Sequence, residues 1–180
     1  MRCLSCQRID FYSRNADVIQ NAHGDGMYCV VPFTLEKVKD VEAFRGVSVA
    51  QQFKRYLVEG KRGFVLYVNS GHTRMCGHVW VWLTAPRRKL FGFLPIPDDE
   101  DFIFFCHVDQ HAAQPLDGAQ SLLATCVDVI RAKRIGISVP RYDKFLRKAV
   151  LVAGFKYVKT LLRLTLFRFT ITVLWFPSHI

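Results

Sequence analysis

The feature that most restricts the fold of this chain is an uninterrupted apolar run at residues 102–108, FIFFCHV. A strand with apolar residues at every position is typical of the interior of an α/β sheet, where other layers cover both of its faces. After a polar stretch, apolar residues recur at helical spacing from Leu122 to Ile130. Asp117 and Gln120 stand where a helix cap and its capping-box partner are expected. The sequence therefore predicts a buried strand that leads through a loop into a helix.

Similar patterns continue on both sides of this unit. Apolar and β-branched segments predict strands at residues 27–33, 64–68, 78–83, 135–139, 156–166 and 169–176. Amphipathic spacing predicts helices at residues 48–59 and 142–153, and Gly154 marks the end of the second. This order predicts a single α/β domain, residues 1–180, with a mixed central sheet and helices on both faces. Residues 1–45 carry no motif that indicates a function, and residues 1–25 are expected to form a peripheral N-terminal extension.

The charge of the chain bears on its partners. A formal net charge of +10 predicts an anionic partner, such as a nucleotide phosphate, a nucleic acid or a lipid surface, although a solubilising surface would carry the same charge. Residues 161–176 are strongly apolar, but Arg163 and Arg168 interrupt them, so this segment is too short and too charged to span a bilayer. Peripheral membrane contact through this basic, apolar tail stays open.

The six cysteines indicate a reduced, cytoplasmic protein rather than a metal site. Only Cys3 and Cys6 form a CxxC pair, and no second pair completes a zinc ligand set, so no metal is expected. The other four lie in apolar surroundings, which predicts buried thiols; they are Cys29, Cys76, Cys106 and Cys126. No secretory signal is recognisable in residues 1–20.

Residues 75–170 resemble the GNAT superfamily of acyl-CoA N-acyltransferases. In that family a buried strand ends in a loop of type [RQ]-x-x-G-x-[GA], which opens a helix. Here Gln114 matches the first position and Ala119 the last, while Asp117 stands in place of the glycine with Gly118 beside it. In a second match, the stretch from Asp143 to Gly154-Phe155 follows the family's pattern, with aspartate in place of the usual asparagine.

The resemblance implies acetyl-CoA or another acyl-CoA as co-substrate. Backbone N–H groups of the loop and the helix start would hold the CoA pyrophosphate, and those of residues 106–108 would bind the thioester carbonyl and the pantetheine arm. The implied cofactor-binding residues are Cys106, Val108, Gln114, Gly118, Ala119, Gln120 and Asp143. A bulky β-branched residue at Gly118 is expected to abolish donor binding and leave the fold intact.

Two catalytic candidates lie at the end of the apolar strand. His107 titrates near neutrality and could act as the general base together with Asp109, although a core histidine and a turn-capping aspartate would look the same. Many GNAT members place a tyrosine acid on the helix that here carries Val150. The resemblance therefore implies an N-acyltransferase acting on a small-molecule amine, such as an amino sugar. Two alternatives stay open: a phage-type DNA-base-modification enzyme that binds nucleic acid, and a non-catalytic GNAT-like binding domain. The oligomeric state is not fixed, and a dimer stays open.

Overall fold

Alternating strands and helices build the protein around one large sheet. The computed structural model describes residues 5–15, 27–70, 72–83, 89–90, 94–95, 100–130, 134–166 and 169–175. The strands of the large sheet are β1 (Ser5–Asn15), β2 (Tyr28–Pro32), β3 (Arg62–Ser70), β4 (His72–Trp82), β7 (Glu100–Val108), β8 (Arg134–Pro140), β9 (Lys156–Leu166) and β10 (Phe169–Trp175). A separate two-stranded sheet joins β5 (Lys89–Leu90) to β6 (Leu94–Pro95).

The large sheet has eight strands in the order β10-β9-β1-β8-β7-β4-β3-β2. Every neighbouring pair is antiparallel except β7 and β8, which run parallel, so the sheet is mixed as predicted. The connection from β7 to β8 passes through a helix, as a parallel pair requires.

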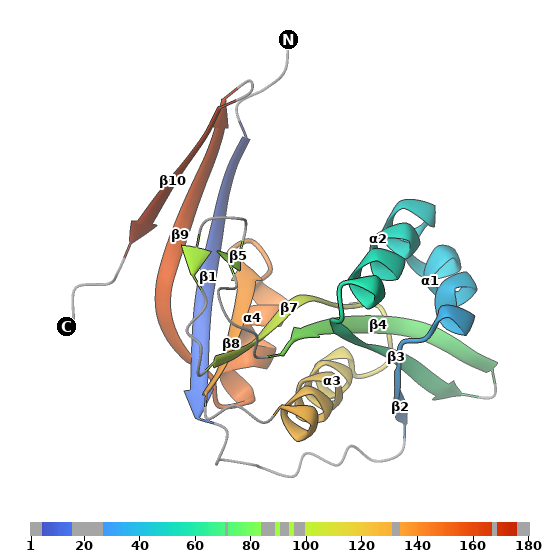
Figure 1. Cartoon of the computed structure of the whole chain (residues 1–180). Coiled ribbons are helices and arrows are strands. Elements are labelled where there is room, and N and C mark those ends of the chain that lie inside the picture. Colours follow the sequence, from blue (N-terminus) through green and yellow to red (C-terminus); the bar gives the residue numbers. More distant parts are fainter. Residues whose placement is uncertain are drawn as a thin grey trace.

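Helices cover both faces of this sheet (Figure 1). The elements on one face are a short 3₁₀ helix η1 (Leu35–Lys37), α1 (Val38–Arg45) and α2 (Val47–Val58); those on the other face are α3 (Pro115–Val129) and α4 (Lys144–Val152). On the first face, Val41 and Phe53 pack with Trp80 of β4 in one buried cluster. On the second face, Leu122 and Ala149 pack with Val79 and other sheet residues in another. Adjacent residues of β4 thus point into the two cores, which confirms the predicted α/β architecture.

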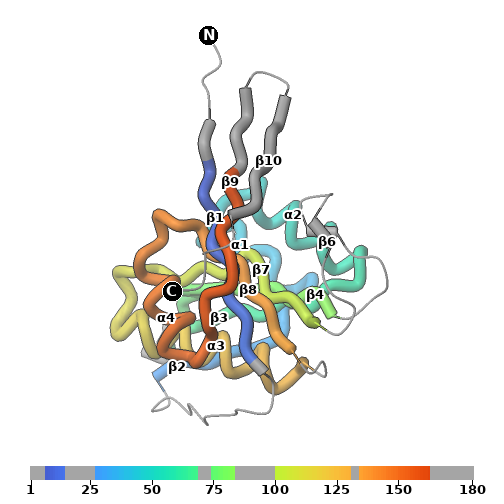
Figure 2. The backbone as a smooth tube through the Cα atoms, turned by 90° about the vertical axis from the view of Figure 1, so that its left-hand side faces the viewer, coloured from blue at the N-terminus to red at the C-terminus, as the bar shows by residue number. Residues whose placement is uncertain are grey.

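β1 is an interior strand, flanked by β8 on one side and β9 on the other. Figure 2 shows it, in blue, running alongside the red β9. Its residues Ile9, Phe11 and Tyr12 are buried. Asp10 is buried too, and its carboxylate accepts a hydrogen bond of 2.7 Å from the Thr160 hydroxyl and lies 3.4 Å from Arg147 Nε. The predicted peripheral role is therefore wrong for residues 5–15, because their burial depends on partners far along the chain.

Several boundaries differ from the sequence prediction. α1 was not predicted, and β4 begins at His72 rather than at residue 78. α3 begins at Pro115, so Asp117 lies inside its first turn and does not cap it. Proline fits the first helical position because the N–H that it lacks has no helical partner there. α4 begins after Asp143, whose side chain caps it, and Gly154 follows it with a φ of +82°, as predicted.

Cys29, Cys76, Cys106 and Cys126 are free thiols. Cys76 and Cys126 are buried and Cys106 is partly buried, whereas Cys29 is exposed on the edge strand β2, so the prediction of a buried thiol is wrong for Cys29. Cys3 lies outside the described residues. Among the described residues, no helix combines the length and the apolar character that a membrane crossing requires.

Candidate active site

The two parallel strands at the centre of the sheet separate toward their C-terminal ends. β7 and β8 are paired only from Glu100 and Arg134 to Ile103 and Ile137. On its other side β7 stays paired with β4 as far as Val108, which lies opposite Gly77. Residues 104–108 of β7 therefore have no partner on β8, and we call this side of the strand the open edge. Backbone groups along an unpaired edge are free to bind a ligand that lies between the strands.

A bulge lies at the start of the open edge. The register of β4 and β7 shifts between His78 and Trp80, and Phe105 has a φ of +51°. This left-handed conformation costs a residue with a large side chain about 1–3 kcal/mol. Rings of Phe53, Tyr56 and His78 lie within 6.3 Å of the Phe105 ring, centroid to centroid, and hold it in place. Bulges of this kind bend a strand away from its neighbour and re-aim its side chains.

Beyond Val108 the chain enters a tight loop that leads into α3. The Asp109 N–H donates to the Cys76 carbonyl at 2.7 Å, and the Asp109 carboxylate accepts from the His111 N–H at 3.0 Å. At the helix start the Gln114 carbonyl accepts from the N–H groups of Asp117 and Gly118. Within the described part of the chain, the amides of Ala113, Gln114 and Leu116 make no backbone hydrogen bond. These amides, together with the helix dipole, can receive an anion.

Three of the predicted cofactor-binding residues face the protein interior. Val108 and Ala119 are buried in the core. A Cβ added at Gly118 would stand 2.9 Å from Leu66 Cδ2 and 3.2 Å from Tyr28 Cζ. A β-branched side chain at Gly118 would therefore displace the side chains of Leu66 and Tyr28, so such a variant is expected to lose stability as well as donor binding. Only the backbone of these three residues can face a ligand.

Other predicted residues border the loop and the open edge. Gln114 is exposed at the N-cap of α3, in the left-handed conformation, and Gln120 is half-buried one turn into the helix. The Asp143 carboxylate accepts from the Leu146 N–H at 2.8 Å. Burial, and to a smaller extent the charge of Asp143, raises the pKa of the Cys106 thiol to about 12, so this thiol stays protonated and is not a nucleophile. Cys106 packs against the same buried cluster as Phe145 and Leu146 of α4, so the start of this helix lies near the open edge.

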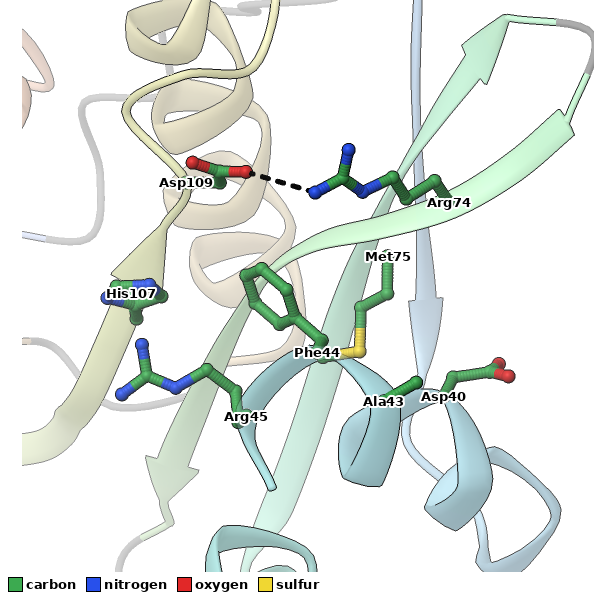
Figure 3. Close-up of a pocket in the computed structure, with 8 residues that line it drawn as sticks. All are labelled: Asp40, Ala43, Phe44, Arg45, Arg74, Met75, His107 and Asp109. Atoms are coloured by element: carbon green, nitrogen blue, oxygen red, sulfur yellow. Dashed lines mark ion pairs between the residues drawn. The ribbon is translucent and has the colours of Figure 1, made fainter.

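Both predicted catalytic residues line one pocket, on the face of the sheet that α1 covers (Figure 3). The pocket has a volume of about 490 Å³, within the range of small-ligand sites. We call it the His107 pocket; its lining residues are Asp40, Ala43, Phe44, Arg45, Arg74, Met75, His107 and Asp109. They come from α1, from β4 and from the end of β7.

The charged residues of the His107 pocket differ in whether they have a hydrogen-bond or ion-pair partner. The Asp40 carboxylate accepts a hydrogen bond from the Tyr67 hydroxyl, and Asp109 pairs with Arg74 at 3.8 Å. Arg45 is half-buried, burial lowers its pKa, and it makes no hydrogen bond or ion pair with the residues that the structure describes. Figure 3 shows its guanidinium group extended toward His107.

The His107 imidazole favours its neutral form. Burial is the main cause of its lowered pKa, and the positive charge of Arg45 acts in the same direction. Asp143 and Asp109 oppose the shift without reversing it. A neutral imidazole can accept a proton, which is what a general base requires.

A second histidine stacks on His107 from β4. The rings of His78 and His107 lie 5.6 Å apart, centroid to centroid, at an interplanar angle of 27°. His78 is completely buried, and neither ring nitrogen makes a well-formed hydrogen bond with a described residue, although the nearby Phe105 carbonyl weakly favours the protonated ring. Burial is the main cause that lowers the pKa of His78 well below 6.5, and the charge of Arg45 and the neighbouring His107 add to it.

Replacement of His78 by leucine should therefore change how stability depends on pH. Below pH 6.5 the unfolded wild-type chain takes up a proton at His78 that the folded protein does not, so its free energy of unfolding falls as the pH falls. We expect the wild type to lose about 1.4 kcal/mol per pH unit relative to His78→Leu below pH 6.5, and nothing above it. Urea unfolding between pH 5 and pH 8 measures this difference. His111→Leu, an exposed histidine, is the control, and a constant wild-type-to-variant difference for His78→Leu would contradict the expectation.

The pocket residues other than His107 and Asp109 were not predicted from the sequence. Asp40, Phe44 and Arg45 belong to α1, where Val38 and Val41 mark a buried helical face that the spacing could have shown. Arg74 and Met75 precede residue 78 in β4, so the predicted strand started too late to include them.

The architecture matches acetyltransferases of known structure. A tandem GNAT protein from the clavulanic acid biosynthesis pathway superimposes with a TM-score of 0.61 at 14% identity, over 96% of this chain and 55% of that one. A conserved protein of unknown function from Staphylococcus epidermidis gives 0.61 at 14% identity, over 89% and 62%. A GNAT acetyltransferase from Colwellia psychrerythraea gives 0.54 at 12% identity, over 98% and 58%.

The chain spans 55–62% of the length of these three structures. No protein-family model and no curated protein sequence matches it. The match therefore rests on the arrangement of strands and helices, and it confirms the GNAT fold that the motifs around residues 102–120 and 143–155 predicted.

Proposed function

Starting from a GNAT fold with an open strand junction, we propose that this protein transfers an acyl group from acyl-CoA to a primary amine. The observation that carries the proposal is the separation of β7 from β8 after Ile103, directly before a loop and helix start with unpaired amides. The pantetheine arm would lie along the open edge, and the pyrophosphate would bind the amides of Ala113, Gln114 and Leu116.

The reaction requires charge stabilisation and a proton acceptor. The amine lone pair attacks the thioester carbon, a C–N bond forms, and the carbonyl oxygen becomes an oxyanion. N–H groups of the open edge would stabilise this oxyanion, as backbone donors do in other acyl-transfer sites. The C–S bond then breaks and CoA leaves as a thiolate. His107 would take the proton from the amine nitrogen, because its lowered pKa keeps the ring neutral near pH 7.

No tyrosine acid stands at the position where many GNAT members have one. Val150 occupies it and is fully buried in the core of α3 and α4. We therefore assign no protein acid to the leaving thiolate, which water can protonate at the open junction. The proposed function therefore depends on the donor site and on His107 as the base, and not on a protein acid.

Calorimetric titration with CoA and acetyl-CoA tests the donor site, and Gln114→Glu localises it. A glutamate at the N-cap favours the dipole of α3, so the fold is kept, while its charge repels the pyrophosphate. We expect Gln114→Glu to weaken CoA binding about tenfold or more, which is 1.4 kcal/mol in binding free energy. Gln51→Glu, an exposed position on α2, makes the same chemical change elsewhere and should bind CoA like the wild type.

Absence of CoA binding at millimolar ligand would overturn the proposal. Equal affinity of Gln114→Glu and the wild type would place the pyrophosphate elsewhere. Acetyl-CoA binding without thiol release across a panel of primary amines would instead support a non-catalytic acyl-CoA-binding domain.

A further inference from the structure

We infer that the acceptor amine carries a negatively charged group, a carboxylate or a phosphate, and that Arg45 binds it in the His107 pocket. The inference rests on the proposed acyl transfer, and it adds the chemical class of the acceptor. Its physical basis is a half-buried guanidinium group that has no counterion among the described residues, in a pocket large enough for a small ligand.

The interactions of the charged residues show which side chain of the pocket is available to bind a ligand. The Asp40 carboxylate accepts a hydrogen bond from the Tyr67 hydroxyl, and the Asp109 carboxylate pairs with Arg74 and accepts from the His111 N–H. Arg45 alone among the charged residues of the pocket has no protein partner in the described part of the chain. Partial burial of a guanidinium group without a partner costs free energy, because the group loses hydration. A bound carboxylate or phosphate would compensate for this cost with charge-assisted hydrogen bonds.

The position of Arg45 fits a group that enters together with the amine. Arg45 ends α1, and its side chain reaches toward His107, the proposed base. A ligand held by Arg45 through an anionic group would therefore present a nearby nitrogen to the imidazole. The aromatic ring of Phe44, 5.8 Å from the His107 ring, gives the rest of such a ligand an apolar surface.

CoA also carries phosphates, but the fold separates its expected site from Arg45. The unpaired amides belong to the start of α3, which packs on one face of the sheet, whereas α1 packs on the other. The pyrophosphate and the anion at Arg45 would thus be bound by different elements on opposite faces. This separation makes the two sources of negative charge distinguishable by experiment.

The first test uses inorganic phosphate and acetate as probes on the full chain. Their binding is followed through chemical-shift changes of the arginine Nε–Hε signals and of the His107 ring. We expect saturable binding to the wild type, a weakening of about tenfold or more in Arg45→Gln, and partial recovery in Arg45→Lys. Arg55→Gln removes the same charge from an exposed position on α2 and should bind the probes like the wild type. Equal binding by Arg45→Gln and the wild type would overturn the inference.

The second test separates the acceptor from the donor. CoA affinity should stay within about twofold of wild type in Arg45→Gln, since α1 and α3 pack on opposite faces of the sheet. If CoA and phosphate affinities fall together, Arg45 binds a phosphate of CoA and the inference is wrong. If the wild type binds phosphate at Arg45 but no CoA, the proposed acyl transfer fails while the anion site itself stands.

The third test uses pairs of amines that differ only in a carboxylate or a carboxamide, such as phenylalanine and phenylalaninamide. The wild type should prefer the carboxylate member, and Arg45→Gln should reduce the ratio of the two kcat/KM values about tenfold. Comparison of ratios cancels the different basicity of the two amines. An unchanged ratio in Arg45→Gln would overturn the inference even if both amines are acylated.

Discussion

Replacement of His107 by glutamine is expected to lower kcat/KM for acyl transfer by a factor of about 10²–10⁴, the usual contribution of a general base. Glutamine keeps a polar side chain of similar reach but cannot accept a proton from the amine. Thiol release from acetyl-CoA in the presence of an amine acceptor measures the effect. CoA affinity should not change, because the residues proposed to bind the pyrophosphate lie in the loop and at the start of α3.

The pH profile of kcat/KM distinguishes a proton acceptor from a residue that only fills space. Neutral His107 is the active form and its pKa is lowered, so the wild-type rate should fall as the pH drops through a value below the ordinary 6.5. In His107→Gln this fall in kcat/KM at low pH should disappear. The pH dependence that comes from protonation of the amine substrate should remain. His111→Gln changes an exposed histidine of the neighbouring loop and serves as the control. A His107→Gln variant that keeps half of the wild-type kcat/KM would rule out this base.

Removal of residues 1–15 is expected to abolish cooperative folding. These residues include β1, whose Ile9, Phe11 and Tyr12 side chains are buried. Burial of three such side chains contributes about 5–9 kcal/mol, which is comparable to the whole stability of a typical domain, about 5–15 kcal/mol. Removal of β1 also takes away the strand that pairs with both β8 and β9. Arg147 in addition loses Asp10, its ion-pair partner. Circular dichroism and urea unfolding measure the loss.

A peptide of residues 5–15 added in trans provides the matched control for this truncation. It should restore the unfolding transition, because it supplies the missing strand between β8 and β9. A peptide with Phe11→Asp should not, since Phe11 is buried against Phe102 and Leu161. A shortened chain that unfolds with the wild-type midpoint would show that β1 is dispensable.

The parts of the fold that could be predicted are those with locally encoded signals. The apolar run at residues 102–108 was predicted as a strand and forms most of β7, although residues 104–107 are only partly buried because they border the open edge and the His107 pocket. α4 was predicted from its amphipathic spacing and from Gly154, which ends it; Asp143, which caps it, was placed inside the predicted helix. β9 and β10 follow the β-branched content of the C-terminal segment.

The parts that could not be predicted depend on distant partners. β1 reads SCQRIDFYSRN, with charged residues among apolar ones, and its Asp10 is buried only because Thr160 and Arg147 satisfy the carboxylate. The left-handed backbone of Phe105 is likewise imposed by the rings packed around it, since a phenylalanine disfavours that conformation by itself. Such features have no signature in local spacing.

The candidate site was predicted in outline. His107 and Asp109 do share a pocket, and their catalytic roles stay predictions. α3 starts close to where the loop motif placed it, but its N-cap lies three residues earlier, at Gln114 instead of Asp117, and this changes which amides are unpaired. Arg45 was missed because α1 was not predicted. The buried face of α1 extends over barely two helical turns, which is too short for a helical period to be recognised in the sequence.

The interior position of β1 also fixes when the protein can mature during synthesis. During synthesis β1 must wait for β9, and the hydrogen bond between Asp10 and Thr160 joins residues 150 positions apart. Closure of so long a loop is slow and entropically unfavourable, so β1 lacks its two neighbours in the sheet until β8 and β9 have been synthesised. During that interval Ile9 and Phe11, which are buried in the folded protein, lack this cover, and exposed apolar strands of this kind favour aggregation.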